Sequence, residues 1–204
     1  MSEERPSSLL VPLRTDVLQA LRAATAPLHE RLDNGLPIAR EDASLDDYVA
    51  HLRVLRPWLL GLRRDLLASG VAGLQAVARR IDAKLADLAL DLVDARDSAP
   101  EREVACRPTD ARTLPAFGWG LAYVVEGSQL GGVVLHRRLR DRLAPHPLRY
   151  LAKPGDEAGV GARWRDFVLQ LRESVADPTS VRQAERGATA AFLDLLERFG
   201  ARQD

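Results

Sequence analysis

The sequence Gly118-Trp-Gly-Leu-Ala-Tyr-Val-Val-Glu-Gly-Ser-Gln-Leu-Gly-Gly132 lies within a longer segment, about Leu114 to Leu143, that is otherwise typical of a helix. Each glycine inside a helix costs about 1 kcal/mol relative to alanine, so this density of glycines needs a reason. At about 100° per residue, Gly120, Gly127 and Gly131 fall within about 20° of one line along the helix. The pattern predicts a face of bare backbone, against which a large flat ligand or another helix could lie closely.

Length and composition limit the class of protein. The 204 residues suit one domain, which we place at residues 13–204 after a tail of residues 1–12. Lys plus Arg and Asp plus Glu balance at 29 each, so no overall field attracts nucleic acid or an acidic membrane. The single cysteine, Cys106, excludes an internal disulfide and suits a reducing compartment. No signal peptide or long apolar run is visible, so we expect a cytoplasmic protein without a membrane span.

Apolar residues recur at helical spacing in five further segments, at about 15–33, 44–69, 74–93, 161–175 and 178–199. Ser44 is expected to cap the second segment with Asp47 in its first turn, and Asp177 to cap the last. Pro27 should kink or split the first, because proline removes a backbone donor. No segment alternates with a period of two. The sequence therefore predicts an all-α fold of six or seven helices around one core.

One of the four histidines has neighbours suited to metal binding. Asp33 lies four residues after His29, and Arg22 seven residues before it, so all three share a side of the first helix. Asp33 can accept the Nδ1 proton of His29, which leaves Nε2 free for a metal. The other three histidines have less suitable positions. His51 lies beside the apolar stripe of its helix, His136 points away from the glycine line, and His146 lies between two prolines.

Each of these signals also has an ordinary structural explanation. The glycines could simply allow close helix packing, and arginines suit the end of a helix because its dipole is negative there; they are Arg137, Arg138, Arg140 and Arg142. The aromatic residues are expected in the core: Phe117, Trp119, Tyr123, Trp164 and Phe192. Together the signals favour a ligand. One helix offers a histidine, a carboxylate and an arginine, and the other offers a bare strip with Arg138 two turns beyond it. A flat, iron-centred dianion such as heme would use all of them.

Two motifs carry a resemblance to a known family. Ala24-Thr-Ala-Pro-Leu-His-Glu-Arg-Leu-Asp33 and Tyr123-Val-Val-Glu-Gly-Ser-Gln-Leu-Gly-Gly132 resemble the bacterial heme oxygenases, especially those associated with bacteriophytochromes. The likeness extends over about residues 14–199, including Asp177-Pro-Thr-Ser-Val-Arg and Ala190-Ala-Phe-Leu. It implies a single-domain, all-α heme oxygenase-like bundle in which heme b, both substrate and cofactor, is clamped between a proximal and a glycine-rich distal helix.

The resemblance also implies roles for individual residues. His29 would be the axial ligand of the heme iron, and Gly127, Ser128 and Gly131 would form the catalytic distal segment. Ser128 stands where the animal enzymes carry an aspartate that anchors distal water, so we expect proton delivery through water held by Ser128 and nearby backbone. The remaining heme contacts would come from Arg22, Asp33, Tyr123, Gly127, Gly131, Gly132, Arg138, Arg165 and Phe192.

The implied activity is the cleavage of heme to biliverdin, CO and ferrous iron with O2 and a reductant. No phosphate-binding glycine fingerprint follows a strand, so the electrons must come from an external ferredoxin or flavoprotein reductase. A bacteriophytochrome would be the recipient of the biliverdin. The alternatives are a non-catalytic heme carrier, which needs no bare distal face, a thiaminase-like protein of the same fold, and a structural adaptor. A thiaminase-like site would need a cysteine or paired carboxylates in the core, whereas Cys106 falls in the connection predicted at 94–113.

Overall fold

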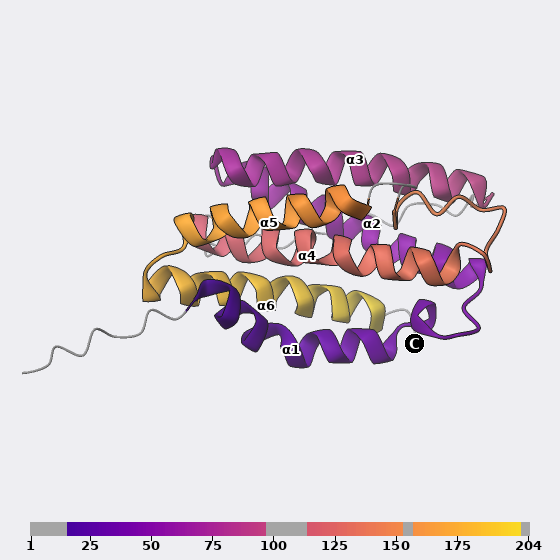
Figure 1. Ribbon diagram of the computed structural model, residues 1–204, viewed down its shortest axis with the longest axis horizontal. Coiled ribbons are helices and arrows are strands. Elements are labelled where there is room, and N and C mark those ends of the chain that lie inside the picture. The colour runs from indigo at the N-terminus through magenta and orange to yellow at the C-terminus, as the bar shows by residue number, and fades with distance from the viewer. Residues whose placement is uncertain (1–15, 97–113, 153–156, 201–204) are drawn as a thin grey trace, which may run out of the picture.

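The computed structural model describes residues 16–96, 114–152 and 157–200, and these form α-helices and one short 3-10 helix with no strand. The predicted tail and Cys106 lie outside the described residues. The all-α prediction is confirmed. The helices run along the long axis of the molecule (Figure 1). They are α1 (Val17–Gly35), η1 (Pro37–Ala39), α2 (Leu45–Ala68), α3 (Ala72–Asp94), α4 (Pro115–Leu139), α5 (Glu157–Ser174) and α6 (Pro178–Gly200).

Helix α6 lies between α1 and α4, the two helices that the sequence predicts on either side of a ligand. It packs closely along α4 and also contacts α1 and α2. In Figure 1 it lies between α4 and α1, while α3 lies on the far side of the bundle from α1. The helices α1 and α4 are therefore held at a fixed separation mainly through α6.

Local sequence signals correctly predicted two helix starts. Ser44 and Asp47 form a reciprocal capping box at the start of α2: the Ser44 hydroxyl accepts the Asp47 N–H, and the Asp47 carboxylate accepts the Ser44 N–H at 2.8 Å. Asp177 accepts hydrogen bonds from the backbone N–H groups of Thr179 and Ser180 at the start of α6. Both caps are confirmed, because each depends on residues only three positions apart.

The sequence predicts that Pro27 kinks or splits the first helix, and the helix is not split. Helix α1 continues through Pro27 as one element, although its first part runs obliquely to the rest in Figure 1. The hydroxyl of Thr25 donates to the carbonyl of Leu21 at 2.8 Å, and such side-chain bonds to the preceding turn often accompany a bend. Another boundary also differs, because α5 begins at Glu157 rather than near Gly161.

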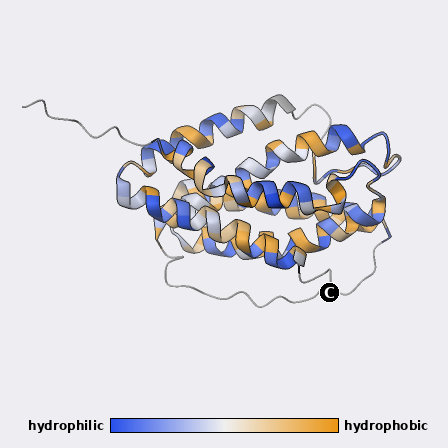
Figure 2. Ribbon diagram, turned by 90° about the horizontal axis from the view of Figure 1, so that it is seen from below, coloured by the Kyte–Doolittle hydropathy of each residue, from blue (hydrophilic) through white to orange (hydrophobic). Residues whose placement is uncertain are grey.

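The core is built from apolar residues of all the described α-helices. Each helix ribbon in Figure 2 carries both hydrophobic and hydrophilic residues. Tyr48 and Trp58 of α2 are almost fully buried. The indole N–H of Trp58 donates to the carbonyl of Ala191 on α6 at 3.1 Å, so this large ring is buried without an unpaired donor. Burial of these rings fixes α2 against α6 and leaves the other side of α6 for α1.

The structure corrects the interpretation of one glycine on the predicted bare line. A Cβ atom on Gly120 would lie 1.9 Å from the carbonyl oxygen of Ala184, and one on Gly187 would lie 2.1 Å from the carbonyl oxygen of Phe117. These two glycines allow α4 and α6 to pack backbone against backbone. Gly120 therefore serves helix packing, and only the part of the line beyond it is bare.

Candidate functional site

A cleft of about 560 Å³ lies between α1 and α4. This volume is within the range of about 300–1,000 Å³ that is typical of small-molecule sites. Four of the residues predicted from the sequence line it, together with four neighbours on α1. The lining residues are Arg22, Thr25, Ala26, His29, Glu30, Asp33, Asn34 and Tyr123. One wall is thus a single face of α1, and Tyr123 contributes from α4.

His29 is oriented by two contacts. Its Nδ1 lies 2.9 Å from the Asp33 carboxylate, as the spacing along the helix predicts. Its ring also lies against Phe192 of α6, with the two centroids 5.9 Å apart. Phe192 is buried while the His29 side chain is 62% exposed, so the imidazole is supported from the core and open to the cleft. Because Asp33 takes Nδ1, Nε2 is the nitrogen left for a ligand.

The face of α4 that contains Tyr123 continues towards its C-terminus as an open apolar surface. Gly127 and Gly131 follow Tyr123 at spacings of four residues, and a Cβ on Gly131 would meet no atom within 4 Å. Two exposed apolar residues, Leu130 and Val134, share this side of the helix. The bare strip that the sequence predicts is therefore confirmed at Gly131, next to apolar side chains that a ligand could cover.

Three further predicted contacts lie differently from the expectation. A Cβ on Gly132 would be 2.7 Å from the Leu151 carbonyl oxygen, so this glycine faces the following loop, on the side of α4 opposite Tyr123. We therefore remove Gly132 from the cleft wall. Arg138 donates to the backbone carbonyls of Ala39 and Arg40, and so links the end of α4 to η1. Arg165 is exposed on α5 and does not line the cleft.

Ser128 is tied to its own helix. Its hydroxyl donates to the Val125 carbonyl at 2.7 Å, and the Gln129 amide also approaches that oxygen, at 3.5 Å. The hydroxyl proton is thus used locally, whereas the oxygen can still accept a hydrogen bond from water. Ser128 is exposed, so water has access to it.

Trp164 of α5 is a residue near the site that the sequence reasoning assigned to the core. Its ring lies 3.8 Å from where a Cβ on Gly127 would be, and it packs on Tyr123 with centroids 5.8 Å apart. It therefore covers Gly127 beside the cleft. No local pattern could reveal this contact, because α5 follows α4 only after a long connection. The lining residues Thr25 and Ala26, in contrast, follow from helical spacing to His29.

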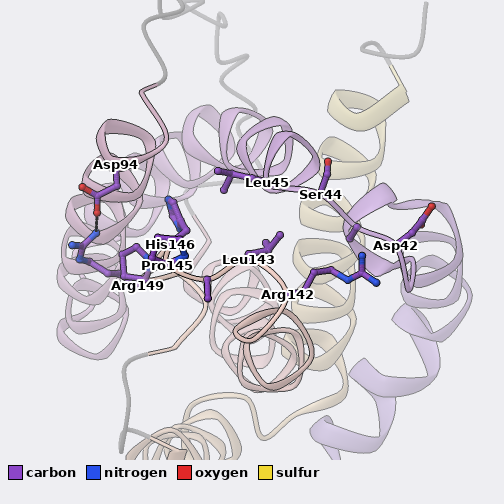
Figure 3. A pocket seen from close by; sticks show the side chains of 12 residues that line it. Asp42, Ser44, Leu45, Asp94, Arg142, Leu143, Pro145, His146 and Arg149 are labelled. Carbon is purple, nitrogen blue, oxygen red and sulfur yellow. Dashed lines mark hydrogen bonds and ion pairs between the residues drawn. The ribbon is translucent and has the colours of Figure 1, made fainter.

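A separate hollow of about 860 Å³ is larger but less suited to chemistry (Figure 3). Two of its charged residues pair with each other: Arg149 pairs with Asp94, and also with the buried Asp91 behind the lining. The buried His146 ring lies 2.9 Å from the Asp91 carbonyl oxygen. None of the residues predicted for a ligand site lines it. The smaller cleft between α1 and α4 is therefore the better candidate.

Comparison with known proteins supports the same fold. No family model matches the chain. A protein of Xanthomonas campestris named heme oxygenase is 39% identical over 93 residues, which are 42% of this chain and 54% of the relative. This chain thus spans about half the length of the curated relative it matches. The heme oxygenase of Neisseria meningitidis, solved with NO and CO bound, superposes with a TM-score of 0.69 at 23% identity, over 91% of this chain and 93% of that one.

This chain has the heme oxygenase fold. The superposition covers nearly the whole of both chains, so the similarity extends well beyond the cleft to the complete arrangement of helices. The helices in the described parts of the chain also include none that is both long and apolar enough to cross a membrane.

Proposed function

We propose that this chain is a heme oxygenase, which uses O2 and an external reductant to cleave heme to biliverdin, CO and ferrous iron. One observation carries the proposal: a single cleft has the His29–Asp33 pair on one wall and, on the other, a helix whose open side lacks a Cβ at Gly131. The name of the Xanthomonas relative and the fold shared with the Neisseria enzyme support the same activity.

The described residues fit heme b as the ligand. His29 would bind the iron through Nε2, with Asp33 holding the ring in the required tautomer. Arg22 lines the cleft, and Arg138 ends the open face of α4. Arg138 contacts the carbonyls of Ala39 and Arg40 through one guanidinium nitrogen, so we propose that its other N–H groups and Arg22 bind the two carboxylates of heme. Leu130 and Val134 would cover apolar ring surface. Arg165 stays a weaker candidate for a carboxylate contact.

Bound heme would supply both the iron that activates O2 and the ring that is oxidised. The protein would hold the heme in position and deliver protons to it. The backbone at Gly131 can approach the ring face because no Cβ intervenes there, whereas Gly127 lies next to the Trp164 ring. Ser128 would hold water on this side through its hydroxyl oxygen and pass protons along it. Phe192 of α6 packs against the His29 ring and so limits its rotation.

The electrons would come from a ferredoxin or flavoprotein reductase. Exposed arginines around the end of α4 would attract an acidic surface of such a donor; they are Arg137, Arg138, Arg140 and Arg142.

We further propose a cytoplasmic location, a bacteriophytochrome as the recipient of biliverdin, and a single domain over residues 13–204. The support for the last is one apolar cluster to which every described α-helix contributes.

The test is to add hemin to the purified protein and to record its absorption spectrum before and after ascorbate is added under air. We expect a histidine-type Soret band that decays while the broad red band of biliverdin grows. His29→Ala should lose or shift that Soret band, because no other described residue of the cleft offers a nitrogen ligand of this kind. His51→Phe is the matched control, since His51 does not line the cleft.

The possible results separate the candidate functions. A stable Soret band that never converts would reject the enzyme and favour a heme carrier. A spectrum that is the same in His29→Ala and wild type would reject the axial assignment. If no heme band appears at all, the proposed function is rejected, and helix packing explains Gly120 but not Gly131.

A further inference from the structure

Burial along α4 is interrupted after Glu126 and resumes at Val133. From Ala116 to Glu126 every residue except Tyr123 is buried, whereas none is buried from Gly127 to Gly132. The first half of the helix is held by backbone contact with α6 at Gly120. The glycine segment therefore follows a closely packed part of the helix and is itself only half-buried or exposed.

The helix is continuous at this boundary, but one of its carbonyls has side-chain donors in addition to the backbone. The Val125 carbonyl accepts from the Ser128 hydroxyl and lies within reach of the Gln129 side-chain amide. In a regular α-helix this carbonyl accepts the N–H four residues on, and competing side chains bend a helix at such a point. With glycine at 127 and 131, the direction of the following turn is poorly determined by the helix itself.

One contact from a neighbouring helix acts on this boundary. Arg80 of α3 donates through Nε to Oε1 of Glu126 at 2.8 Å. The Glu126 side chain is 6% exposed and that of Arg80 is 41% exposed, so the carboxylate is buried with its counter-charge reaching in from the surface. A buried carboxylate without a partner is strongly disfavoured, so the side chain of Glu126 must remain where Arg80 lies.

We propose that Arg80 and Glu126 are positioning residues that fix the glycine segment Gly127–Gly132 beside the cleft. The pair holds Glu126, the last buried residue before the glycine segment, to α3, at the point where the Val125 carbonyl has competing donors. It thereby sets the direction of the helix through Gly127 and Gly131. The function of the segment in heme cleavage rests on the proposed function, whereas its positioning by the pair does not.

The test is amide hydrogen exchange on the protein without heme. In Arg80→Gln, we expect the amides of residues 127–132 to exchange about tenfold faster or more, because Glu126 loses its counter-charge. Arg80→Lys keeps the charge and should give a smaller increase. Replacing both partners, as Arg80→Gln with Glu126→Gln, should bring the rates back towards wild type, since no unpaired charge is left buried.

Asp16→Asn is the matched control. It breaks the ion pair of Asp16 with Arg172, which joins the start of α1 to α5 and does not involve α4. We expect it to leave exchange in residues 127–132 unchanged. The proposal is overturned if Arg80→Gln changes these amides no more than Asp16→Asn does, or if it accelerates all helices equally. If Arg80→Gln does not fold, the comparison of Arg80→Lys with wild type decides in the same way.

A second readout uses added hemin. The absorption bands should shift in Arg80→Gln and stay at the wild-type positions in Asp16→Asn, because only the first changes the side opposite His29. If wild type binds no hemin, the proposed function fails while the exchange result still supports the positioning pair. If hemin binds and exchange in residues 127–132 is unaffected by Arg80→Gln, the pair is a stability element only and this inference is wrong.

Discussion

His51 of α2 packs against α6, and this environment disfavours the charged form of its imidazole. Its ring stacks on Phe199 with centroids 5.4 Å apart, and among the described residues its buried Nδ1 has no hydrogen-bond partner. Burial lowers the pKa of His51 from its usual value of 6.5 to about 4. The folded protein therefore contains neutral His51 over a range of pH in which the unfolded chain is already protonated.

This shift predicts acid sensitivity. Between about pH 6.5 and pH 4 the unfolded state binds the extra proton, so the free energy of unfolding should fall as pH falls, by up to about 3 kcal/mol. The measurement is urea unfolding at about pH 7 and about pH 4.5. His51→Phe keeps an aromatic ring against Phe199 and should lose less stability between the two conditions. An identical pH dependence in both proteins would contradict the assignment.

At the scale of the helices, the glycines of α4 have two different purposes. Gly120 lets α4 pack against the backbone of α6, whereas Gly131 leaves an open surface. The same residue type on the same side of one helix thus provides packing at one end and ligand access further along. What separates the two cases is the presence or absence of α6 beside the helix.

Alanine substitutions should distinguish these purposes. Gly120→Ala places a Cβ 1.9 Å from the Ala184 carbonyl oxygen, so the helices must separate, and we expect a loss of about 2 kcal/mol or more. Gly131→Ala meets no atom within 4 Å, so the heme-free protein should gain up to about 1 kcal/mol from helix propensity. Urea unfolding of the two variants measures both changes. Equal effects would show that α4 and α6 are not in backbone contact at Gly120.

At the scale of the whole molecule, the carboxylate of Asp91 joins three parts of the chain. It is fully buried on α3 and accepts hydrogen bonds from the Tyr48 hydroxyl of α2 at 2.7 Å and from the Tyr150 backbone N–H at 2.9 Å. Arg149 adds a contact from the loop after α4. Burial, together with the Asp91 charge, raises the pKa of Tyr48 far above its usual range, so its hydroxyl remains a donor.

Removal of this carboxylate should be among the most damaging changes to the fold. Asp91→Ala leaves two buried donors unsatisfied, and we expect a loss of about 3 kcal/mol or more. Tyr48→Phe removes one donor only and should cost about 1–2 kcal/mol. The difference between their urea unfolding midpoints tests the network. If the two variants lose the same stability, Asp91 does not connect the loop to the helices as the structure indicates.

The amino-acid sequence by itself determined the features that depend on spacing along one helix. The helical segments, the caps at Ser44 and Asp177, and the contact of His29 with Asp33 all join residues at most a few positions apart. Such contacts follow from the geometry of a single helix, whatever surrounds it. The motif containing Gly127 and Gly131 likewise indicated a bare strip before any neighbour was known.

The tertiary structure alone decided which helix lies against each face. It placed Gly120 on α6, turned Gly132 towards Leu151, and brought Trp164 over Gly127. It also paired Glu126 with Arg80, which is 46 residues earlier in the chain. Periodicity gives the direction of a side chain around its own helix axis, but the angles and distances at which helices pack depend on all the side chains between them. That packing separates the open half of the glycine line from the closed half.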